Sequence, residues 1–109
     1  MAAGYWDLAM AEERLGLSAK AKDHFDKALA EWLTIIEQLP ETTFTTARAH
    51  HMAGEYHRHF NEYEKAIPYY QTILDTWPEY GFVEHAWRMV KLLHERIANR
   101  QFHPFPPAP

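Results

Sequence analysis

The chain repeats itself at a spacing of 38 residues. The segments LPETTF and WPEYGF share a proline, a glutamate and an aromatic residue at the same offsets. A fixed period of this kind indicates that one supersecondary unit has been duplicated. The residues matched at this spacing are Trp6, Phe44 and Phe82; Gly16 and Gly54; Phe25 and Tyr63; Ala28 and Ala66; Leu29 and Ile67; Trp32 and Tyr70; Ile35 and Ile73; Ile36 and Leu74; Pro40 and Pro78; and Glu41 and Glu79.

Each unit contains one segment with the 3.6-residue rhythm of an amphipathic helix. Pro40 and Pro78 are predicted to end these helices, because proline lacks an amide hydrogen and disfavours helical geometry in the residue before it. In the connections that follow, Phe44 and Phe82 are predicted to pack under the next helix. The periodic apolar positions are Phe25, Ala28, Leu29, Trp32, Ile35, Ile36 and Leu39, and then Tyr63, Ala66, Ile67, Tyr70, Ile73, Leu74 and Trp77.

Further helices are predicted at about 4–21, 45–60 and 82–99. The first two contain Gly16 and Gly54, where we expect a neighbouring backbone to come close. Polar turns that join the helices as antiparallel hairpins are expected at Lys22 with Asp23 and at Asn61 with Glu62. The sequence therefore predicts an all-α fold of about five helices in two and a half units. One domain spans 1–100, and a proline-rich tail spans 101–109.

Composition narrows the classes of function. With 109 residues, 47% of them hydrophobic, the chain suits one globular module. A net charge of -4 argues against nucleic acid as a partner, because neutralising phosphates takes clustered Lys and Arg. There is no cysteine, no apolar run long enough for a membrane span, and no signal-peptide pattern at the start. The chain reads as soluble and cytoplasmic as it stands, or periplasmic if it is a mature fragment, so the compartment stays open.

The repeated residues resemble the tetratricopeptide repeat family over about residues 4–80, with half a repeat beyond. The family pattern has a small residue, an aromatic, an alanine, a second aromatic and a proline at fixed positions. The period is four residues longer than usual, and His50 and His57 stand where the family prefers Trp and Tyr, as do Glu12 and Ala19 in the first unit. The matching residues are Gly16, Phe25, Ala28, Trp32 and Pro40, and then Gly54, Tyr63, Ala66, Tyr70 and Pro78.

The longer period, with an aromatic four residues after the proline, is similar to repeats in bacterial envelope proteins. Examples are the lipoprotein of the outer-membrane barrel-assembly machinery and the Tol-Pal-associated periplasmic coordinator. The family resemblance implies a right-handed stack of helix hairpins whose first helices line a concave groove for a partner's peptide or helix. The family's carboxylate clamp is not reproduced, because Glu13 and Leu17 occupy its first positions. The implied groove residues are Met10, Glu13, Leu17, Arg48, His51, Glu55, Arg58, His59, Met89, Leu93 and Arg96.

Histidines gather in the segment HHMAGEYHRHF, residues 50–60. His51, Glu55 and His59 share one helix face, but they span about 12 Å at 1.5 Å per residue, too far for all three to reach one ion. Adjacent pairs could contribute to a metal site that another helix or chain completes. A solvated or groove-lining polar face is the simpler interpretation, so no metal or cofactor is assigned. His50 and His57 are expected on the core side, partly buried with hydrogen-bond partners.

No glycine-rich phosphate loop, nucleophile elbow or paired-histidine zinc motif is present. We therefore predict a non-enzymatic module that binds another protein. Two alternatives stay open: a homodimer or assembly scaffold that uses the apolar residues of 82–97, and a histidine-based metal protein. The apolar residues of 82–97 spread over most of the helix, and a fold-back of Phe102 and Phe105 in the tail is one way to cover them.

Overall fold

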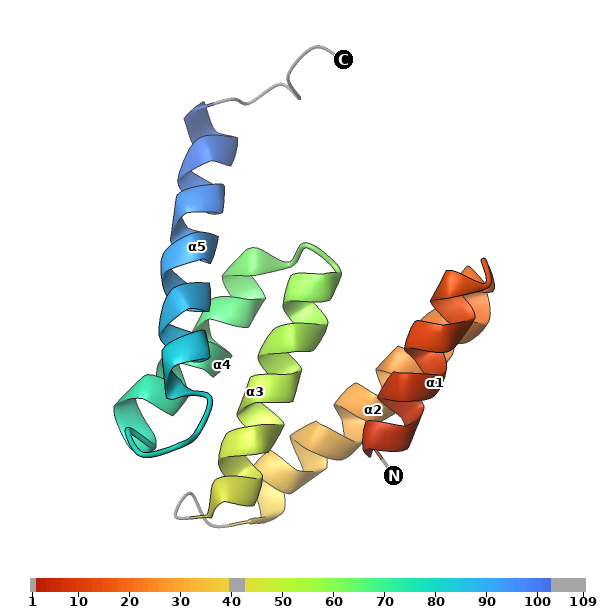
Figure 1. The fold of residues 1–109 in the computed structure, drawn as a ribbon, viewed down its shortest axis with the longest axis horizontal. Coiled ribbons are helices and arrows are strands. Elements are labelled where there is room, and N and C mark those ends of the chain that lie inside the picture. Colours follow the sequence, from red (N-terminus) through yellow and green to blue (C-terminus); the bar gives the residue numbers. More distant parts are fainter. Residues whose placement is uncertain (1, 40–42, 103–109) are drawn as a thin grey trace.

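The computed structural model describes residues 2–39 and 43–102. These residues form only α-helices and connections, so the predicted all-α class is confirmed for the described part of the chain (Figure 1). None of its helices is both long and apolar enough to cross a membrane. The helices are α1 (Ala2–Arg14), α2 (Ser18–Gln38), α3 (Phe44–His59), α4 (Tyr63–Thr76) and α5 (Val83–Phe102).

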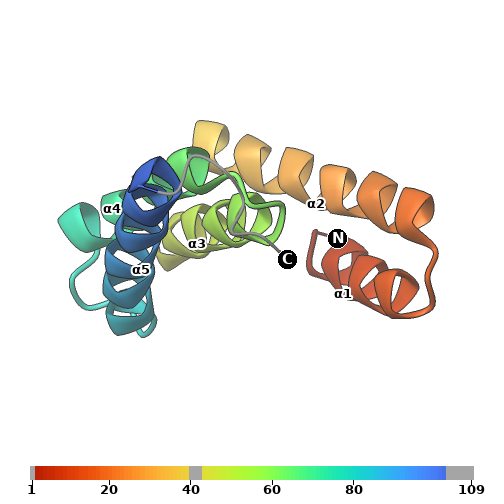
Figure 2. The same ribbon diagram turned by 90° about the horizontal axis from the view of Figure 1, so that it is seen from above.

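Each helix packs against the next one along the chain. The two ribbon views place α1, α3 and α5 toward one side of the molecule, with α2 and the paler α4 behind them (Figures 1 and 2). Long side chains join α1 to α3: Trp6 packs in one cluster with Met52, and Glu13 reaches His59. The odd-numbered helices therefore share a face of the molecule.

The core contains most of the positions that the periodicity predicted. Phe25, Ala28 and Trp32 of α2 are buried against α1 and α3, and Ala66, Tyr70 and Ile73 of α4 are buried between α3 and α5. Leu39 is an exception at 39% exposure, because it lies beyond the last turn of α2.

The turns of both hairpins use the same capping geometry. After α1, the amide of Leu17 donates to the carbonyl of Glu12, and Gly16 has a φ of 80°. After α3, the amide of Glu62 donates to the carbonyl of His57, and Asn61 has a φ of 60°. A residue in this left-handed conformation at the end of a helix satisfies carbonyls that the helix leaves open, and Gly and Asn adopt it most readily.

The first turn lies earlier than predicted. Gly16 ends α1 because its left-handed conformation stops the helix, so the helix expected over 4–21 stops at Arg14. Lys22 and Asp23, which were expected in the turn, lie within α2. The turn predicted at Asn61 is confirmed.

The two units therefore differ although their sequences match. α2 has 21 residues and α4 has 14, so α2 is longer by seven residues, or about two helical turns. Gly16 forms a turn, whereas its counterpart Gly54 remains inside α3.

Gly54 allows α4 to approach α3 closely. A Cβ atom at Gly54 would lie 2.9–3.1 Å from three ring atoms of Tyr70, tighter than almost all real Cβ contacts. A close approach occurs at Gly54, but the nearest atoms belong to the Tyr70 side chain and not to the backbone that was predicted. At Gly16 a Cβ would meet nothing within 4 Å, so the close approach predicted there is wrong.

The aromatic residues after the two prolines are not buried. Phe44 is 56% exposed and Phe82 is 55% exposed, so the prediction that they pack under the next helix is wrong. Tyr80 takes the buried place instead and contacts both phenylalanine rings. Tyr80 belongs to the apolar cluster of α3, α4 and α5, whereas the two phenylalanines stay on the surface.

The remaining sequence features either lie outside the described residues or are exposed on a helix. Pro40, Glu41 and the tail with Phe105 lie outside the described residues. Pro68 is exposed, α4 continues through it, and the Thr72 hydroxyl donates to its carbonyl at 2.8 Å.

We predict that Gly54→Ala destabilises the protein by about 1 kcal/mol. Overpacking against the buried Tyr70 ring costs about 1–3 kcal/mol, and alanine's better helix propensity returns about 1 kcal/mol. Urea denaturation measures the change. Gly4→Ala in α1 is the control, because a Cβ there has open space and stability should stay equal or rise. Equal stabilisation by both changes would contradict the close contact at Gly54.

Candidate functional site

An open hollow lies where α1, α3 and α5 meet. It has a volume of about 330 Å³, and a neighbouring hollow of about 230 Å³ adjoins it under Phe82. Both share His51, Met52 and Phe82, so they form one continuous depression, called the hollow below. Its lining residues are Trp6, Arg48, His51, Met52, Glu55, Tyr80, Phe82 and His85.

The polar centre of the hollow is the carboxylate of Glu55. The Tyr70 hydroxyl of α4 donates to its Oε1 at 2.6 Å, and Nε2 of His85 from α5 donates to the same oxygen at 3.0 Å. The Arg58 guanidinium donates to Oε2 at 2.6 Å. One side chain of α3 thereby binds both α4 and α5.

These contacts fix the charge states of Glu55 and Tyr70. Burial would raise the pKa of the Glu55 carboxyl, but the nearby His51 and the hydrogen bonds from Tyr70, His85 and Arg58 outweigh it and hold that pKa well below the ordinary 4.5. Burial and the nearby carboxylate raise the pKa of Tyr70 far above the ordinary 10.0. Tyr70 is therefore a neutral donor to an ionised carboxylate at neutral pH.

Two histidines flank this carboxylate. His51 precedes Glu55 by one turn of α3, and its Nε2 lies 3.7 Å from Oε1. His85 approaches from the first turn of α5, and the two imidazole centroids are 5.2 Å apart. One ligand atom of each of the three side chains lies within 4.8 Å of the other two. Imidazole and carboxylate are the ligand types that zinc and similar ions accept.

His59 does not join this cluster. Its Nε2 contacts Glu13 Oε2 of α1 at 2.9 Å, and its ring lies against Phe25. The three residues predicted to share one face therefore have different neighbours. His51 and Glu55 lie beside His85 of α5, whereas His59 contacts Glu13 of α1. Arg58 turns back to Glu55.

The remaining predicted groove residues are spread out. Arg48 is exposed and lines the hollow. Met10 packs beside the core at the α1–α2 contact, and Leu17 is 44% exposed in the first turn, so neither lines the hollow. Arg96 is exposed at the far end of α5, where it lies over the Tyr63 ring.

Leu93 and Met89 face the core. Leu93 is fully buried in the cluster of α3, α4 and α5, and Met89 packs against the same cluster. The apolar partner contact predicted for Leu93 is therefore wrong, because α4 already covers its side chain.

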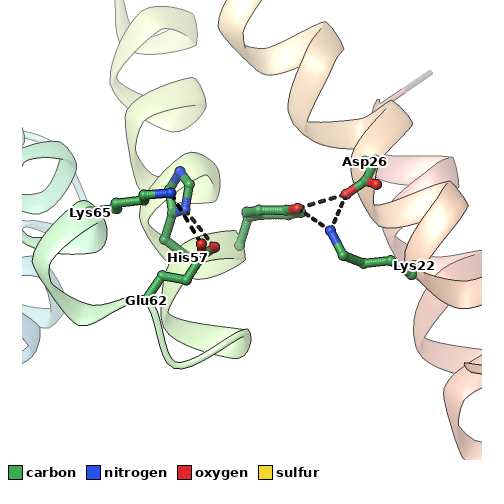
Figure 3. Close-up of polar contacts among 6 residues, drawn as sticks. Lys22, Asp26, His57, Glu62 and Lys65 are labelled. Carbon is green, nitrogen blue, oxygen red and sulfur yellow. Dashed lines mark hydrogen bonds and ion pairs between the residues drawn. The ribbon is translucent and has the colours of Figure 1, made fainter.

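The core-side histidines behave as predicted. His50 is buried, and its Nδ1 pairs with the Thr46 carbonyl at 3.0 Å. His57 stacks on Tyr69, and its Nδ1 contacts Glu62 at 3.1 Å; Lys65 also binds Glu62 (Figure 3).

A second polar group joins α2 to α3. Lys22 donates to the Tyr56 hydroxyl at 2.7 Å, and that hydroxyl donates to Asp26 at 2.6 Å (Figure 3). Lys22 also pairs with Asp26 at 2.6 Å. Lys22 comes from the extra N-terminal turns of α2, and the group links the first hairpin to the second.

Sequence reasoning missed several residues of the hollow. Trp6 was counted only as a repeat position, and Met52 was not singled out; Tyr70, which binds Glu55 from behind the hollow, was counted only as repeat and core. His85 lies one turn before the predicted Met89, so extending that face by one turn would have included it. Nothing in the local sequence signals that the Tyr70 hydroxyl reaches Glu55.

Comparison of the chain with protein-family models, curated proteins and solved structures finds no match. The geometry of the hollow and of its polar centre is what bears on function.

We predict that Tyr70→Phe lowers the free energy of unfolding by about 2 kcal/mol, since a hydrogen bond to a buried charged group is worth roughly 1.5–3 kcal/mol. Chemical denaturation measures it. Tyr63→Phe is the matched control, because its hydroxyl makes only surface contacts and its loss should change stability by less than about 0.5 kcal/mol. Equal losses in both variants would show that the Tyr70–Glu55 bond is unimportant.

Proposed function

We propose that the chain is a non-enzymatic, tetratricopeptide-like interaction module that binds a peptide or helix of another protein in the hollow. The observation that carries this proposal is the shared lining of the hollow by α1, α3 and α5. These are the leading helices of the two and a half units that the 38-residue period defines. In a stack of such units, the leading helices form the concave face.

The composition of the hollow suits a peptide side chain. Trp6, Met52 and Phe82 offer apolar surface, and the last of these is 55% exposed. Binding sites are mostly apolar, with a few polar groups that fix orientation. His51 and His85 supply such groups at the floor.

The sequence placed Glu55 among the residues that contact a partner, but its role in the hollow is a different one. Both of its oxygens already accept hydrogen bonds from the protein's own side chains. It therefore organises the floor, and the histidines beside it offer the polar contacts. Arg48 at the edge adds an exposed positive charge, which favours a partner with an acidic residue next to its apolar anchor.

Self-association through 82–97 is the weaker alternative. Several apolar residues of α5 pack into the cluster shared with α4, and Phe82 and Trp87 are the large apolar side chains within 82–97 that are strongly exposed, each at 55%. A stable interface buries about 800 Å² on each partner, far more than these two side chains provide.

We predict that Phe82→Ser weakens peptide binding at least about tenfold, since a central apolar anchor contributes more than about 1.4 kcal/mol. Peptides selected from a displayed random library against the wild-type protein are measured by fluorescence anisotropy. Trp87→Ser is the matched control, because it removes an equally exposed aromatic residue outside the hollow. A library that yields no binding peptide, or equal losses in both variants, would refute the proposal.

Light scattering over a concentration series tests the alternative. We expect a monomer at all concentrations, with no change in Trp87→Ser. A wild-type dimer that Trp87→Ser dissociates would instead favour assembly through α5.

A further inference from the structure

We propose that His51, Glu55 and His85 form a binding site for one divalent transition-metal ion of the zinc type. The site lies on the floor of the hollow and combines two turns of α3 with the first turn of α5 (Figure 1). This inference does not depend on peptide binding, because it rests on the positions of three ligand atoms.

The spacing of those atoms suits a small ion. Ligands bound to zinc at about 2.0–2.2 Å in a tetrahedral arrangement lie roughly 3.3–3.6 Å from one another. In the protein, Nε2 of His85 lies 3.0 Å from Glu55 Oε1, and Nε2 of His51 lies 3.7 Å from the same oxygen. All three ligand atoms fall within 4.8 Å of one another. Small side-chain rotations are enough to bring them around one ion.

The carboxylate is held in place by groups behind it. The Tyr70 hydroxyl and the Arg58 guanidinium bind its oxygens, and such partners orient a metal ligand before the ion arrives. Oε1 accepts from Tyr70 through one lone pair and keeps another for a metal. The proton that His85 shares with Glu55 leaves when an ion takes its place, since a metal-bound imidazole nitrogen carries no proton.

Arg58 limits the affinity. Its positive charge lies 2.6 Å from the second carboxylate oxygen and opposes a divalent cation on the other side. We therefore expect micromolar binding, weaker than in closed structural zinc sites. Three protein ligands leave one position open, and the hollow exposes that position to water or to a donor atom from a bound partner.

The experiment is a calorimetric titration of the full chain with zinc chloride, repeated with cobalt(II) chloride and read by visible absorption. We expect one ion per chain, and cobalt bands typical of nitrogen and oxygen ligands. His85→Ala should weaken binding at least about tenfold, because loss even of a supporting group costs 10–100-fold. His94→Ala is the matched control: it removes an exposed histidine from the same helix and should leave affinity unchanged.

Absence of binding in the wild-type protein, or equal affinity in His85→Ala, would overturn the site. Circular dichroism tests whether His85→Ala remains folded, and the 37% exposure of the His85 side chain favours that outcome. Zinc should raise the melting temperature of the wild type and of His94→Ala by more than that of His85→Ala, because an ion that binds only the folded state stabilises it in proportion to its affinity. Phe82→Ser separates the two proposals, since it should lose peptide affinity and keep its zinc affinity.

Discussion

The hydrogen bond between the Tyr70 hydroxyl and the Glu55 carboxylate sets the arrangement of three helices. It forms because Gly54 has no side chain, which lets the Tyr70 ring lie against α3 beside the next residue. The carboxylate held there is also the acceptor for His85, so α5 is positioned through the same group. A buried charge is costly unless it is fully paired, and this one is paired from three helices. The floor of the hollow follows from that requirement.

The two sides of the hollow are held by different forces. α3, α4 and α5 share a continuous apolar cluster behind the polar centre. The first hairpin joins α3 partly through smaller apolar clusters and partly through polar contacts, in which Tyr56 meets Lys22 and Asp26 while His59 meets Glu13. Exposed ion pairs contribute little energy and weaken with salt. The α5 side of the hollow, which carries the histidine–carboxylate group, is therefore the side whose packing depends less on salt-sensitive ion pairs.

Periodicity predicted the helices and most of the core, because a 3.6-residue apolar pattern directly reports the buried face. The 38-residue match also identified the first helix of each unit, and residues of these helices line the hollow. The pattern failed at the glycines, whose roles depend on the backbone. Gly16 and Gly54 occupy matching positions, but Gly16 adopts a left-handed conformation that ends α1, whereas Gly54 stays helical and packs against the Tyr70 ring. Contacts between distant helices, such as His85 with Glu55, leave no local pattern. Phe44 and Phe82 were misplaced, because the aromatic side chain buried in that region belongs to Tyr80, which contacts both rings.

The extra seven residues of α2 bear on how this chain could be lengthened by design. Copies of residues 6–43 would carry the early break at Gly16 and a long trailing helix into every position of an array. Copies of 44–81 would carry the glycine and tyrosine that lock one hairpin internally. The second block is the unit to tile, and the first hairpin suits the role of an end piece, since terminal units of helical arrays commonly depart from the internal ones.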